Sequence, residues 1–198
     1  MEAKSSQPSN GIPEEQRREC AESALRCFGT AYIFERRAIP IRKRLRWLTF
    51  LGIAGPAALG AVVATFSLGK AALAISVGLV GIIGIGQLIL SIWALVAKWD
   101  DGLAYYTESK SANYRLADEY AKLMKAQCLA PQEFDMQFKQ LETEGRLRTE
   151  LDQRQDITDQ EKRMGMRAGL RQYQRACAGC KTVPVSLRAT ECEICGKF

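Results

Sequence analysis

The chain contains no histidine among its 198 residues, and this absence limits the chemistry open to it. Histidine is the side chain that most often acts as a general acid or base near neutral pH. The carboxylates between residues 142 and 152 are interleaved with arginines, which is the pattern of a solvated helix face. No glycine-rich phosphate loop precedes a helix either, so we expect that the protein is not an enzyme.

Charged side chains are almost missing from the middle of the chain. Between Trp47 and Trp99 the only charged residues are Lys70 and Lys98, although the whole chain has a formal net charge of +6. Lys98 lies at the end of this apolar block, and Lys70 lies near its centre. The sequence is therefore divided into one long apolar block and two strongly charged ends.

The apolar block divides into two segments, 47–66 and 71–97, separated by the run Ser67-Leu68-Gly69-Lys70, which is typical of a tight turn. Each segment has about the 20 residues that a helix needs to cross a bilayer. A buried hairpin in a soluble protein is the alternative, but the charged remainder of the chain offers too little apolar surface to cover it. We predict a two-helix transmembrane hairpin in an all-α membrane protein.

Basic residues next to the first segment predict the topology. Lys- and Arg-rich loops stay on the cytoplasmic side of a membrane, and two spans return the chain to that side. The first apolar run begins too far from Met1 to be a cleavable signal peptide. Both termini are therefore expected in the cytoplasm, on the strength of a cluster formed by Arg36, Arg37, Arg42, Lys43, Arg44 and Arg46.

The charged ends show helical patterns and no alternation that would form a sheet. We expect a polar tail up to Pro13, then an amphipathic helix that breaks or kinks at Pro40, and a further break or bend at 100–102. A helix is expected to begin at Pro131, and another at Thr158, whose spacing to a glutamate predicts a capping box.

Four regions follow from these patterns. The N-terminal tail and amphipathic helix occupy 1–46, the hairpin 47–99, a cytosolic helical region 100–176 and a cysteine module 177–198. The seven cysteines of the chain are expected to lie in the reducing cytoplasm, where metal sites are favoured over disulfides.

The last 22 residues contain two Cys-x-x-Cys pairs separated by eleven residues. Two such pairs joined by a short loop present four thiolates to one metal ion, and Gly196 suits the tight turn that follows the second pair. With no histidine the site is all-cysteine and closed, which favours structural zinc over catalytic zinc. Redox sensing and an iron site are the alternatives for the expected ligands Cys177, Cys180, Cys192 and Cys195.

Small residues line the second apolar segment. Gly78, Gly81 and Gly84 let helices approach closely, which favours several hairpins packing into a homo-oligomer, a tetramer or larger. Contact within a single hairpin is the simpler alternative. Gln87 is the strongly polar side chain deep in this segment, and it is expected either to line a pore or to bond another helix.

Together these features resemble a known group of bacterial proteins. The amphipathic helix, basic junction, two spans and following helix are similar to the SLATT family of two-span effectors. The run Asp156-Ile157-Thr158-Asp159, the ending Arg175-Ala176-Cys177 and the Cys-x2-Cys-x11-Cys-x2-Cys spacing resemble its mobile-element-associated CxxCx(11)CxxC branch.

The resemblance implies an effector of bacterial antiphage defence in the inner membrane. Such relatives are expected to oligomerise into a pore that disrupts the host membrane, in response to a nucleotide signal made by a nucleotidyltransferase. The alternative is a membrane-anchored adaptor that recruits a protein partner through its zinc module. Phosphate binding is expected from four arginines spaced four apart, which could equally face anionic lipid: Arg163, Arg167, Arg171 and Arg175.

Overall fold

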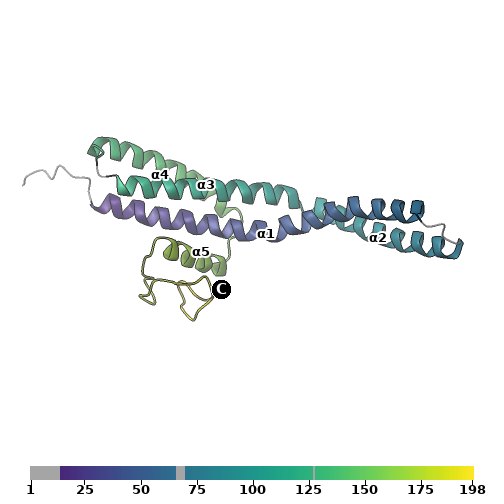
Figure 1. Ribbon diagram of the computed structural model, residues 1–198. Coiled ribbons are helices and arrows are strands. Elements are labelled where there is room, and N and C mark those ends of the chain that lie inside the picture. The colour runs from purple at the N-terminus through teal and green to yellow at the C-terminus, as the bar shows by residue number, and fades with distance from the viewer. Residues whose placement is uncertain (1–13, 66–69, 127) are drawn as a thin grey trace, which may run out of the picture. The chain divides into compact units, whose positions relative to one another are not determined.

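The computed structural model describes residues 14–65, 70–126 and 128–198, and these residues form helices and loops without any strand (Figure 1). The predicted tail, 1–13, and the predicted turn residues Ser67-Leu68-Gly69 lie outside the described residues. The all-helical prediction is confirmed for the rest. The helices are α1 (Glu14–Thr65), α2 (Lys70–Val96), α3 (Trp99–Lys125), α4 (Pro131–Gln153) and α5 (Asp159–Gln172).

The described chain divides into two compact units. The terminal unit contains residues 14–35 and 108–198, and the central unit contains residues 36–107. The long helices α1 and α3 each belong partly to one unit and partly to the other. The cysteine module lies in the terminal unit, whereas the apolar block lies in the central unit.

The core of the terminal unit lies where α1, α3 and α4 pack together (Figure 1). Phe134 of α4 is fully buried against α1 and α3, and burial of a side chain of this size contributes about 2 to 3 kcal/mol. Arg17 of α1 donates to the carbonyl oxygens of Met124 at 2.7 Å and Ala126 at 2.9 Å, satisfying acceptors at the end of α3. The other buried members of this core are Cys20, Ala24, Leu116, Tyr120, Leu123 and Leu141.

A buried carboxylate joins α3 to α4. Asp152 accepts hydrogen bonds from Ser109 Oγ and Asn113 Nδ2, both at 2.7 Å, and pairs with Arg148 at 3.1 Å. The assignment of residues 142–152 to a solvated face is therefore wrong for Arg148 and Asp152, which are both buried. A buried charge requires such partners, so this network fixes the register of the two helices.

Helix α5 packs directly against α1 (Figure 1). A Cβ added at Gly165 would lie 2.7 Å from the carbonyl oxygen of Gly29, and one added at Gly169 would lie 2.7 Å from that of Leu25. The two helices thus touch through their backbones, at a Gly-x-x-x-Gly spacing on α5. Only glycine leaves room for this approach.

Local signals set several helix ends as predicted. Pro131 is in the first turn of α4, and Thr158 caps α5 in a capping box whose partner is Glu161. Pro40 does not break α1, which runs through it without interruption. A proline removes one backbone hydrogen bond, and the good helix formers that follow Pro40 continue the ladder.

The junction between α2 and α3 falls earlier than the predicted bend at 100–102. The backbone turns at Lys98, whose φ is 51°, and its N–H donates to the carbonyl of Leu95 at 3.1 Å. Asp100 and Asp101 lie instead in the first turn of α3, where carboxylates stabilise the helix N-terminus.

Replacing Gly169 with alanine is expected to destabilise the docking of α5 by about 1 to 3 kcal/mol, because the new methyl group collides with the α1 backbone. Limited proteolysis of the purified full chain should then cut residues 157–198 sooner than in the wild type. Gly102→Ala is the matched control, since no atom lies within 4 Å of its added Cβ. Equal protection of both variants would contradict the backbone contact.

Candidate metal centre and membrane segment

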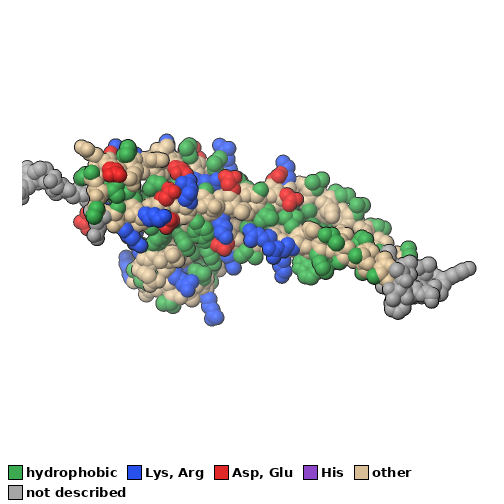
Figure 2. Space-filling view, turned by 45° about the horizontal axis from the view of Figure 1, so that its top comes forward, with side chains coloured by type: hydrophobic (Ala, Val, Ile, Leu, Met, Phe, Trp, Pro, Cys, Tyr) green, Lys and Arg blue, Asp and Glu red, His purple; other side chains and the backbone are tan. Residues whose placement is uncertain are grey.

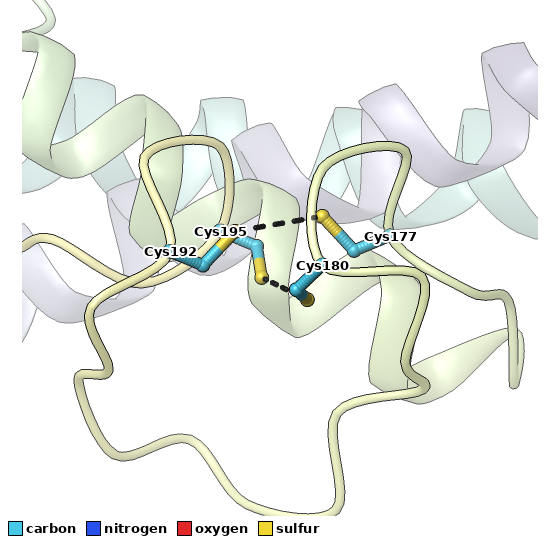
Figure 3. Close-up of side chains that lie close together, drawn as sticks. All are labelled: Cys177, Cys180, Cys192 and Cys195. Atoms are coloured by element: carbon cyan, nitrogen blue, oxygen red, sulfur yellow. Dashed lines mark hydrogen bonds between the residues drawn. The ribbon is translucent and has the colours of Figure 1, made fainter.

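The four predicted cysteine ligands converge from two loops (Figure 3). Their sulfur atoms all lie within 4.8 Å of one another, with 3.9 Å between Cys177 and Cys192 and 3.9 Å between Cys180 and Cys195. A tetrahedral ion with metal–sulfur bonds of about 2.3 Å has sulfur–sulfur edges of about 3.8 Å. The cluster therefore has the spacing of a four-coordinate metal site.

Each Cys-x-x-Cys pair forms a tight backbone turn. The N–H of Lys181 donates to the carbonyl of Cys177 at 2.9 Å, and the N–H of Gly196 donates to that of Cys192 at 2.8 Å. Lys181 has a φ of 57°, so the first turn adopts the left-handed conformation without a glycine. Gly196 is required for a different reason, because a Cβ there would collide with Thr190.

The surroundings of the sulfurs lower the pKa of two of the thiols and raise the pKa of a third. Hydrogen bonds from Thr182 lower the pKa of Cys180 to about 6, and the backbone N–H groups of Cys195 and Ile194 lower the pKa of Cys192. Burial raises the pKa of Cys195 to about 12. A bound dication favours all four thiolates and offsets that burial, so the donor set fits a metal ion.

The metal ligands are also part of the hydrophobic core. Cys177 and Cys195 are almost completely buried and pack with Leu25 of α1 and Leu170 of α5. The module is therefore seated on α1 next to the Gly165–Gly29 contact. Metal binding and docking of the module depend on the same buried atoms.

The structure separates the four arginines expected to bind phosphate. Arg167 is buried and donates to the carbonyl oxygens of Ser186 at 2.8 Å and Cys195 at 3.3 Å. Arg163 donates to the carbonyl of Lys197 at 3.1 Å, so both hold the cysteine module. Arg171 is exposed. The predicted helix reaches Arg175, but α5 ends at Gln172, so the four do not share one helical face.

The sequence analysis missed the roles of Gly165, Gly169 and Arg167. The signal was present in the spacing Gly165-Met-Arg-Ala-Gly169, which allows close helix contact in any surroundings. The same spacing rule that predicts contacts of the apolar segments therefore also holds for this charged helix.

A cavity of about 830 Å³ lies in the terminal unit between α1, α4 and α5. Arg26, Arg146 and Lys162 line it, as do glutamates such as Glu22 and Glu142. Its volume falls in the range of small-molecule sites, about 300 to 1,000 Å³. The four predicted phosphate-binding arginines do not line this cavity.

Within the described residues, one helical segment is long and apolar enough to cross a membrane. It is Val77–Val96 of α2, with a mean hydropathy of 2.3 and only 6% of its residues buried. In Figure 2 charged side chains gather at one end of the central unit, and the described surface beyond them shows hydrophobic side chains among uncharged atoms. The first predicted span forms the last part of α1, and its final residue, Phe66, lies outside the described residues.

Gln87 faces the other helix of the central unit. A Cβ added at Gly52 of α1 would lie 2.7 Å from Gln87 Nε2, so this glycine makes room for the amide. By contrast, nothing lies within 4 Å of a Cβ added at Gly78, Gly81 or Gly84. These three glycines of α2 are therefore not used in the described contacts between α1 and α2.

Comparison with known proteins gives one family. The family described as "Mobilome CxxCx(11)CxxC protein" matches residues 17–198, which includes the cysteine cluster and both units. No curated protein and no solved structure matches the chain.

Metal analysis of the purified chain is expected to find about one metal ion per chain, held by the four sulfurs. Cys177→Ser should release it, because the ion then keeps only three thiolates. The control is Cys128→Ser, which changes an exposed cysteine outside the cluster. Full metal content in Cys177→Ser would show that the cluster is not the site.

Arg167→Gln is expected to weaken metal binding about 10- to 100-fold, because the two carbonyl oxygens that orient the second cysteine loop lose their donor. Competition with a chromogenic chelator measures this change. Arg171→Gln, on the exposed face of the same helix, should leave the affinity unchanged. An equal loss in both variants would point to overall charge instead of the hydrogen bonds.

Proposed function

The chain belongs to the mobilome CxxCx(11)CxxC protein family, and from this premise we propose that it is a membrane effector of a bacterial antiphage defence system. In this proposal it is SLATT-like, lies in the inner membrane with both termini cytoplasmic, and oligomerises to open a path through the bilayer. The observation that carries the proposal is the almost fully exposed apolar surface of Val77–Val96 in α2. Such a surface is stable in lipid and unfavourable in water.

The arrangement of the central unit supports the two-span hairpin in this proposal. The segment of α1 after Trp47 is apolar, and it approaches α2 where Gly52 meets Gln87. A second helix beside α2 gives that amide a neighbour in lipid, where an isolated polar group is costly. Six basic residues lie between positions 36 and 46, just before Trp47, which supports a cytoplasmic location for this end of the hairpin.

The open glycines of α2 support the proposed oligomerisation. Helix association in lipid is driven by close packing, and small residues permit it. Gly78, Gly81 and Gly84 have no described neighbour within the chain that a side chain would meet. We propose that other copies of α2 pack there and form a tetramer or a larger ring, in which movement of Gln87 away from Gly52 would add a polar group to the pore.

The terminal unit would sense the signal. We propose structural zinc for the cysteine cluster, because a closed four-thiolate site suits this ion and leaves no position for a reacting water. A nucleotide signal from a nucleotidyltransferase would bind in the 830 Å³ cavity, with phosphates at Arg26, Arg146 and Lys162. Arg163 and Arg167 are already bonded to the cysteine module.

Membrane depolarisation tests the effector proposal. Cells that express the chain together with its genomic neighbour are expected to lose their membrane potential, as measured with a voltage-sensitive dye. Replacing Gly81 and Gly84 with isoleucine, combined with Gln87→Leu, should abolish the loss because the packing surface is filled. Leu79→Val with Ile83→Val changes side-chain volume elsewhere on α2 and should have little effect. An unchanged membrane potential in cells that express the wild-type chain with its genomic neighbour would refute the proposal.

The second candidate function is a membrane-anchored adaptor, and one observation favours it. The loop between the two cysteine pairs exposes Val185 to 90% and Leu187 to 36%, an apolar tip on the metal module. Such a tip suits contact with a protein partner. Exchange of residues 47–97 for an unrelated two-span hairpin separates the two functions, because an adaptor keeps its activity and an effector loses it.

A further inference from the structure

A groove of about 420 Å³ runs along α1 at the charged end of the apolar block. Its lining residues on α1 are spaced as one face of a helix, with basic side chains first and apolar side chains after them. Leu90 of α2 and Trp99 of α3 complete the wall, and all of these residues belong to the central unit. The α1 residues are Pro40, Lys43, Arg44, Trp47, Leu48 and Leu51.

The two ends of this groove differ in chemistry. Lys43 and Arg44 supply two positive charges at one end, and the guanidinium of Arg44 lies over the ring of Trp99, 5.5 Å from its centroid. Among the described residues, no acidic side chain lines the groove. The other end is a leucine wall, made of Leu48, Leu51 and Leu90.

The apolar walls lack cover among the described residues. Trp47 is 55% exposed, Leu51 41% and Leu90 44%, although each belongs to a recessed surface. Exposed apolar walls next to two cations fit a molecule that is negatively charged at one end and apolar at the other. A helix rises about 1.5 Å per residue, so roughly 12 Å separates Lys43 from Leu51. This length matches the distance from a lipid phosphate to the upper part of its acyl chain.

We propose that the groove binds one anionic phospholipid, with its phosphate at Lys43 and Arg44 and an acyl chain along the leucine wall. The inference rests on the proposed membrane location of α2 and adds a specific lipid site to it. Tryptophans suit this position, because their rings are stable at the boundary between headgroups and hydrocarbon. The lipid would cover the apolar surface that α1, α2 and α3 leave exposed here.

Tryptophan quenching by brominated phosphatidylglycerol tests the site. In the full-length Trp93→Phe chain, the remaining tryptophans, Trp47 and Trp99, both line the groove. Reconstitution in phosphatidylcholine vesicles with increasing brominated phosphatidylglycerol should give half-maximal quenching at about a tenfold lower mole fraction than with brominated phosphatidylcholine. The absence of this preference would overturn the inference.

Paired substitutions separate the groove from general charge attraction. Lys43→Gln with Arg44→Gln should remove most of the tenfold preference. Arg42→Gln with Arg46→Gln removes the same charge from the opposite face of α1, where no groove residue lies, and should keep it. Equal losses in the two double variants would overturn the inference, because the lipid would then respond only to net charge.

A single substitution and a flotation assay separate loss of the lipid site from misfolding and from loss of membrane insertion. Lys43→Gln alone leaves Arg44 on Trp99 and should lose about threefold in preference, even if the double variant fails to fold. Flotation of the wild-type chain with the vesicles reports membrane insertion separately. A chain that floats but shows no lipid preference refutes the lipid site alone, whereas a chain that does not float refutes the membrane function as well.

Discussion

The backbone contact between α5 and α1 is the constraint on which the terminal unit depends. Gly165 and Gly169 bring α5 so close to α1 that no side chain fits between them. This approach places Cys195 in the core beside α1 and lets Arg167 reach the carbonyl oxygens of the second cysteine loop. If the helices were held farther apart, Cys195 would lose its packing against α1, and Arg167 would no longer reach the carbonyl oxygens that accept its hydrogen bonds. The geometry of the candidate metal centre thus depends on the packing of α5 against α1.

The two units differ in where their apolar side chains lie. The terminal unit has a buried apolar core, and the charges within that core are paired, as Asp152 is with Arg148. In the central unit the apolar side chains of α2 face outward, and basic residues gather where α1 leaves the terminal unit. The central unit thus exposes on α2 the kind of apolar surface that the core of the terminal unit buries, which accords with the proposed membrane function.

Local signals were enough to predict part of the structure. The cysteine spacing, the proline at the start of α4 and the capping box at Thr158 act over a few residues, so they can be identified without the fold. The sequence did not reveal the buried Asp152, because an alternation of charges does not show which face another helix covers. The arginine spacing had the same weakness. It predicted a shared face but gave no information on the cysteine loops that Arg163 and Arg167 bind.

Cys177 and Cys195 belong to the candidate metal cluster and to the hydrophobic core at the same time, and this double use would link metal supply to protein quality control. Without an ion the buried Cys195 is a neutral thiol and no bonds join the two Cys-x-x-Cys turns. The turns would then separate more easily and expose the apolar strip around Leu25 to solvent. Newly made chains in a metal-starved cell would display that strip to chaperones and proteases. Abundance of the protein would then follow intracellular metal status even with its transcription unchanged.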